Sequence, residues 1–114
     1  MSKRDLALYI SDILESINAI ESYLEGVDFN AFCKDRKTYS ATIREFTIIG
    51  EAISKIIDIL QENFPHYPWR ILKDFRNFIV HEYFGVNPQI IYDAATLELK
   101  EVKQIMLKIE NKTS

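Results

Sequence analysis

Four polar side chains of different chemistry fall within eight residues, at positions 76–83 of the chain. Arg76 is a permanent cation, Asn77 a carboxamide, His81 an imidazole and Tyr83 a phenol. An arginine can hold a phosphate through two parallel hydrogen bonds, and a histidine can take up or release a proton near neutral pH. The stretch therefore predicts a site that grips a phosphate and moves protons around it.

RNA cleavage without a metal is one reaction that needs this set of groups. A base must take the proton of the 2′-OH, an acid must protonate the departing 5′ oxygen, and a cation must stabilise the charge on phosphorus. His81 can be the base or the acid, Arg76 the cation, and Asn77 can fix the histidine tautomer or donate to a phosphate oxygen. One histidine cannot be both acid and base in one step, whereas a two-fold dimer with two His81 side chains across a cleft supplies both.

Helical geometry limits how these groups can meet. Asn77 and His81 are four residues apart and share a face of a helix. Arg76 and His81 are five apart, about 140° around the axis, so they diverge unless the helix ends near His81 or a second chain completes the site. Gly85 permits a turn just beyond the motif.

Spacing alone also allows readings without catalysis. His81 can be a cap at the C-terminus of a helix. Arg76 can be a surface residue paired with Asp74 or Glu82, and Tyr83 a half-buried core residue. These alternatives remain open at this point.

Composition limits the kind of protein that carries the motif. The 114 residues predict one domain, 1–114, and the net charge of −3 argues against general adhesion to nucleic acid while allowing a local cationic site. The lone Cys33 excludes an internal disulfide, and one cysteine with two scattered histidines makes a poor metal site, so no metal or cofactor is expected. The first residues do not resemble a secretory signal and no apolar run is long enough to span a membrane, which predicts a reducing, cytoplasmic setting.

Basic residues gather in two places. A surface charge cluster is usually a solvated face, but the second of these leads directly into the motif. The clusters are Lys34, Arg36 and Lys37, and Arg70, Lys73 and Arg76.

The remaining pattern is helical. Apolar residues at 3,4 spacing predict helices over 3–25, 43–64 and 88–110, a short turn of helix over 28–34, and a further helix that starts at Pro68. No segment shows the period-two alternation of a half-buried strand. We predict an all-α, antiparallel four-helix bundle with a short extra helix.

Two details of the packing follow from this pattern. Gly50 lies inside the apolar stripe of the central helix, where it costs roughly 1 kcal/mol against alanine, so we expect a second helix to approach it closely. In the motif helix, the inward side chains are predicted to be Trp69, Leu72, Phe75 and Ile79, with Val80 as an additional candidate.

The same residues resemble a known family. Arg76, His81 and Tyr83 match R-x-x-x-x-H-x-Y, the signature of HepT-like toxins in the HEPN superfamily, and Asn77 matches the polar residue usual after the arginine. The segment 49–52 resembles the I-G-E-A of that family's central helix, and 68–69 resembles the P-W that opens its motif helix. The resemblance covers the chain from end to end.

The resemblance implies a HEPN-like bundle that forms a homodimer with the motif at the interface, and a metal-independent endoribonuclease that restrains growth. Arg76 and His81 are then the catalytic residues and Asn77 supports them. It also implies a cognate nucleotidyltransferase antitoxin that transfers AMP to Tyr83. An adenylate there places a negative phosphate two residues from His81, where it would occupy Arg76 and repel RNA.

Two positions concern the fit to the family. Tyr92 stands where relatives often carry tryptophan, and Glu82 fills the variable slot between His81 and Tyr83, where its charge favours protonated His81 and opposes the approach of RNA. Two other functions therefore stay in view. One is a non-catalytic HEPN-type helical module that binds a nucleotidyltransferase, and the other is a structural scaffold whose polar motif is only a cap and salt bridges.

Overall fold

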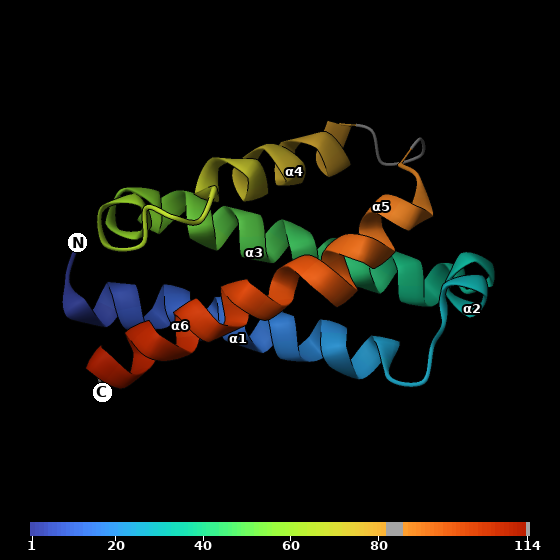
Figure 1. The fold of residues 1–114 in the computed structure, drawn as a ribbon, viewed down its shortest axis with the longest axis horizontal. Coiled ribbons are helices and arrows are strands. Elements are labelled where there is room, and N and C mark those ends of the chain that lie inside the picture. Colours follow the sequence, from blue (N-terminus) through green and yellow to red (C-terminus); the bar gives the residue numbers. More distant parts are fainter. Residues whose placement is uncertain (82–85, 114) are drawn as a thin grey trace.

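The computed structural model describes residues 1–81 and 86–113, and every regular element in them is helical. The elements in chain order are α1 Lys3–Leu24, α2 Phe29–Lys34, α3 Arg36–Asn63, α4 Trp69–His81, α5 Pro88–Asp93, the π-helix η2 Ala94–Glu98 and α6 Leu99–Thr113. The helices α1, α3 and α6 lie alongside one another, α4 lies along α3, and both termini are at the same end of the molecule (Figure 1). The predicted all-α bundle with a short extra helix, α2, is confirmed.

The core forms mainly between α1 and α3. Helix α1 begins where Ser2 Oγ accepts a hydrogen bond from the Asp5 amide at 3.1 Å, and isoleucines at 3,4 spacing then face inward. Helix α3 begins at a similar cap, where Asp35 accepts from both the amide and the hydroxyl of Thr38 at 3.0 and 2.6 Å. It therefore starts seven residues before Ile43, the first residue of its apolar stripe.

The last predicted helix, 88–110, is present, and its residues are helical without a gap from Pro88 to Thr113. Asn87 caps α5 by accepting from the Gln89 amide at 2.9 Å, but the π-helix η2 separates α5 from α6. The Thr96 hydroxyl donates to the Tyr92 carbonyl at 2.8 Å and so competes with the backbone ladder at this point. The wider turn still leaves Ala94, Ala95 and Leu99 buried in the core.

Helix α4 carries the motif and packs against α3. Trp69, Leu72 and Ile79 are buried, and Phe75 is half-buried with its ring centroid 5.2 Å from that of Phe46. Val80, expected as a further inward residue, is 45% exposed, because it stands about 100° around the helix from the fully buried Ile79. The outer face of α4 is consequently apolar in part.

None of the helices in 1–81 and 86–113 is both long and apolar enough to cross a membrane.

Candidate active site at the end of α4

Helices α3 and α4 approach each other closely at Gly50 and Arg76. A Cβ atom placed on Gly50 would lie 2.3 Å from Arg76 Cβ and 2.6 Å from its Cγ. Only a residue without a side chain fits there, because real Cβ atoms do not approach other carbons so closely. The close approach that the sequence predicted for Gly50 is therefore present, and its partner is the arginine of the motif.

Two neighbours hold the Arg76 guanidinium. Arg76 Nη2 forms an ion pair with Glu51 Oε1, and Arg76 Nη1 donates to Asn77 Oδ1 at 2.8 Å. The Arg76 side chain is 30% exposed, so one edge remains open to a ligand. Its Nε is buried and has no hydrogen-bond partner in the described part of the chain.

Glu51, the partner of Arg76, was not among the residues that sequence reasoning offered for that role. The sequence suggested Asp74 and Glu82 as ion-pair partners of Arg76. Neither the helical spacing around Arg76 nor the distribution of charge indicated a partner on α3. The signal that could have found it was the I-G-E-A segment, whose glycine and glutamate both turn out to contact Arg76. Asn77 accepts a hydrogen bond from Arg76, whereas the sequence led us to expect that it would fix the His81 tautomer or donate to a phosphate oxygen.

His81 is the last residue of α4 and its side chain is exposed. The expectation that the helix ends near His81 depends on residues 82–85, which lie outside the described part of the chain. No described residue forms a hydrogen bond or ion pair with the imidazole, so the reading of His81 as a cap on the carbonyls of α4 finds no support among the described contacts. Tyr83, together with Glu82 and Gly85, lies outside the described residues.

The structure therefore brings together Arg76, Asn77 and Glu51, and leaves His81 one and a half turns further along the same helix. The guanidinium is anchored against α3, whereas the imidazole is exposed at the end of α4. Such an arrangement offers a fixed, partly neutralised cation for a phosphate and a nearby group for proton transfer.

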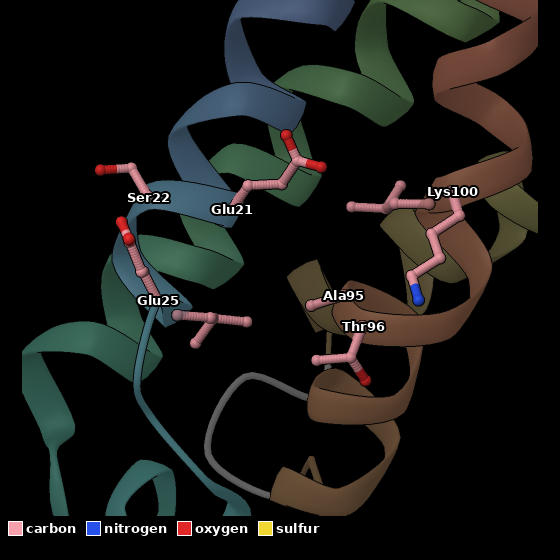
Figure 2. Close-up of a pocket in the computed structure, with 8 residues that line it drawn as sticks. Glu21, Ser22, Glu25, Ala95, Thr96 and Lys100 are labelled. Atoms are coloured by element: carbon pink, nitrogen blue, oxygen red, sulfur yellow. The ribbon is translucent and has the colours of Figure 1, made fainter.

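A separate hollow of about 440 Å³ lies between the end of α1 and η2 (Figure 2). Glu21 of α1 and Glu25, which directly follows α1, line one side, and Lys100 stands opposite. Glu21 also accepts a 2.7 Å ion-pair contact from Lys103. This hollow has carboxylates where a phosphate site needs cations, and it has no imidazole, so the end of α4 is the better candidate.

No group of three or more His, Cys, Asp or Glu within 1–81 and 86–113 is arranged to hold a metal ion.

Comparisons with known proteins identify the family of the chain. The family model described as "Ribonuclease HepT-like" matches residues 13–109. The chain is 34% identical over 101 residues to "Probable ribonuclease HepT" of Thermococcus cleftensis, with 89% of this chain and 92% of the relative covered. It is also 33% identical over 114 residues to a Methanocaldococcus jannaschii protein whose name assigns it provisionally as an RNase, covering 96% and 94% of the two chains.

The chain belongs to the HepT-like family of ribonucleases, since the family model spans most of its length and relatives match nearly end to end. A search of solved structures found no match.

Proposed function

We propose that this chain is a metal-independent endoribonuclease, the toxin of a toxin–antitoxin pair, with Arg76 and His81 as its catalytic residues. The observation that carries the proposal is the anchoring of Arg76. A half-buried guanidinium, fixed by Glu51 and Asn77 beside the exposed His81, is the arrangement that phosphate chemistry needs. Membership of the HepT-like family supports RNA as the substrate.

The reaction would follow from these side chains. An imidazole takes the proton of the 2′-OH, the 2′ oxygen bonds to phosphorus, and the bond to the 5′ oxygen breaks as that oxygen receives a proton from a second imidazole. The products are a 2′,3′-cyclic phosphate and a 5′-OH. Arg76 stabilises the charge on the phosphate oxygens, and Asn77 keeps its guanidinium in the orientation required.

A homodimer would supply the second imidazole. Ile71 and Phe78, seven residues apart and therefore on one side of α4, are 62% and 43% exposed. Large apolar side chains exposed together on one helix are typical of surfaces covered by a partner. Packing of α4 against its two-fold copy would cover them and bring two His81 side chains to one cleft.

Control of the enzyme would act at Tyr83. In this proposal the cognate nucleotidyltransferase antitoxin directs the Tyr83 hydroxyl to the α-phosphorus of ATP, where the new O–P bond forms and pyrophosphate leaves. The attached AMP carries a negative phosphate two residues from His81 in the chain. It would compete with RNA for Arg76 and repel the RNA backbone.

The direct test is cleavage of a single-stranded RNA by the purified chain in the presence of EDTA. Wild type is expected to cleave and His81→Ala to lose at least a hundredfold in rate, as removal of a general acid–base group does. Equal cleavage by the two proteins would assign the activity to a contaminant and remove the enzyme proposal.

A second function, a non-catalytic HEPN helical module that binds a nucleotidyltransferase, is favoured by one observation. Glu51 already neutralises much of the charge on Arg76, in a chain of net charge −3. Mass spectrometry after incubation with the nucleotidyltransferase and ATP separates the two. Modification of Tyr83 without nuclease activity in any form would support the binding module.

A further inference from the structure

The N-terminal half of α3 lies beside the end of the motif helix. Ser40 and Arg44 of α3 line a hollow of about 690 Å³ whose other wall includes Ile79 and Val80 of α4. Val80 immediately precedes His81, so this hollow begins at the candidate active site.

A second hollow continues from the first along α3. It has a volume of about 370 Å³ and is lined in part by Phe32, Arg36, Tyr39 and Val86. Ser40 lines both hollows, so they adjoin at this residue; together they are called the α3 groove, which runs from Val80 to Phe32.

The charges along the α3 groove are positive. Arg36, Ser40 and Arg44 follow one another at intervals of four residues and share one side of the helix. Neither arginine forms an ion pair with a described residue, in contrast to Arg76. The two are separated by a rise of about 12 Å, so they would contact different phosphates of a strand.

This part of α3 also differs in charge from the rest of the helix. Residues 36–50 contain Arg36, Lys37 and Arg44 against one acid, Glu45, which is buried and accepts a hydrogen bond from the Tyr23 hydroxyl at 2.8 Å. Residues 51–63 contain three acids against Lys55. A chain of net charge −3 therefore presents unpaired cations beside its motif.

The far end of the α3 groove is aromatic. Phe32 is fully buried beneath it, and Tyr39 packs on Phe32 with the ring centroids 5.7 Å apart. The Tyr39 hydroxyl donates to the Val86 carbonyl at 3.1 Å, which fixes the ring. Since Phe32 is buried, the half-buried Tyr39 is the ring that this end of the groove offers to a base. An accessible ring beside a row of cations is the usual construction of a site for single-stranded nucleic acid.

We propose that the α3 groove binds the substrate RNA strand next to the point of cleavage, with Arg44 and Arg36 contacting successive phosphates and the aromatic end receiving a base. The inference rests on the proposed ribonuclease function and assigns it a single-stranded substrate. Arg36 and Arg44 are binding residues outside the catalytic motif.

Binding can be measured apart from cleavage with a fluorescent single-stranded oligonucleotide carrying 2′-O-methyl groups, which cannot form the cyclic product. The double variant Arg36→Ala/Arg44→Ala should bind roughly tenfold more weakly. The slope of log Kd against log salt should fall by about 1.4, since each phosphate contact in a single strand contributes about 0.7. Arg36→Lys/Arg44→Lys should keep the wild-type slope, and Lys55→Ala on the acidic half of α3 should change neither quantity.

The outcomes separate this inference from the proposed function. If wild type cleaves RNA while the double alanine variant keeps the affinity and salt slope of wild type, the α3 groove is not the RNA site and the ribonuclease proposal stands. If Lys55→Ala weakens binding as much as the double variant, attraction is general and the groove assignment fails. If wild type neither cleaves nor binds RNA, both proposals fall.

Cys33 provides a check that needs no substitution. It is the single cysteine of the chain, it is exposed, and it lines the aromatic end of the α3 groove. Saturating 2′-O-methyl oligonucleotide should slow its alkylation by N-ethylmaleimide severalfold, whereas inorganic phosphate at equal ionic strength should not. An unchanged alkylation rate with bound oligonucleotide would overturn the proposed path of the strand.

Discussion

Gly50 and Arg76 form a close contact between α3 and α4, and the same arginine pairs with Glu51, the residue that follows the glycine. The motif helix is therefore positioned at the residue on which its chemistry depends. One turn of α3 therefore determines both how closely α4 can approach and how the Arg76 guanidinium is oriented.

Gly50→Ala should destabilise the protein. Alanine normally improves a helix interior by roughly 1 kcal/mol over glycine, but here its methyl group would lie 2.3 Å from Arg76 Cβ and force the helices apart. Overpacking of this kind costs about 1–3 kcal/mol, so we expect a net loss of about 1 kcal/mol in the free energy of unfolding, measured with urea. Gln61→Ala, at an exposed position of the same helix, should change it by less than about 0.5 kcal/mol. A Gly50→Ala protein as stable as wild type would contradict the close contact.

Glu51→Gln should separate stability from activity. The Glu51 side chain is 49% exposed and that of Arg76 30%, so loss of the ion pair should cost less than about 1 kcal/mol of stability. Cleavage should nevertheless slow by roughly tenfold, because the guanidinium loses the partner that orients it. Thermal unfolding and initial rates on one RNA substrate test both parts. An unchanged rate would show that Asn77 alone fixes Arg76.

Phe78→Asp should disrupt the proposed dimer. A carboxylate in the middle of the apolar surface of α4 cannot be buried against a second copy without a large desolvation cost. Sedimentation velocity should then show a monomer, and RNA cleavage should fall in parallel. Leu8→Asp is the matched control, because Leu8 is 57% exposed on α1, outside the motif helix. A Phe78→Asp protein that still forms a fully active dimer would place the interface elsewhere.

Tyr67 should make stability depend on alkaline pH. Burial raises the pKa of its hydroxyl from 10.0 to about 12, with the nearby carboxylates of Glu98 and Glu101 adding to the shift. The unfolded chain loses this proton at a lower pH than the folded protein does. The contribution of Tyr67 to the free energy of unfolding is therefore fully present below pH 10 and is lost as the pH rises from 10 to about 12. Between pH 10 and 12, the free energy of unfolding of Tyr67→Phe should therefore fall by about 2 kcal/mol less than that of wild type. If the free energy of unfolding falls with pH equally in the two proteins, this role of Tyr67 is contradicted.

Much of the fold was predictable from the sequence because the apolar residues repeat at helical spacing with little interruption. The start of α3 was missed because Asp35 caps the helix before its apolar stripe begins. The π-helix η2 within the last helix was not predicted, because the apolar spacing carries no information on the threonine hydroxyl that donates to a backbone carbonyl there.

The candidate site was predictable in its residues more than in its contacts. Arg76 and Asn77 could be singled out by type and spacing, but their roles depend on which residue of α3 stands opposite, and that is set by tertiary packing. The partner on α3, Glu51, is 25 residues from Arg76 in the chain, beyond the reach of local helix rules. The role of Tyr83 remains a prediction.

The most direct test of the catalytic claim uses an oligonucleotide with one ribonucleotide among 2′-O-methyl residues, incubated with the protein in EDTA. Wild type is expected to cut only after the single free 2′-OH and to leave a 2′,3′-cyclic phosphate, and His81→Ala is expected to leave the oligonucleotide intact. Cleavage at positions that lack a 2′-OH, or equal cleavage by the His81→Ala protein, would contradict the account.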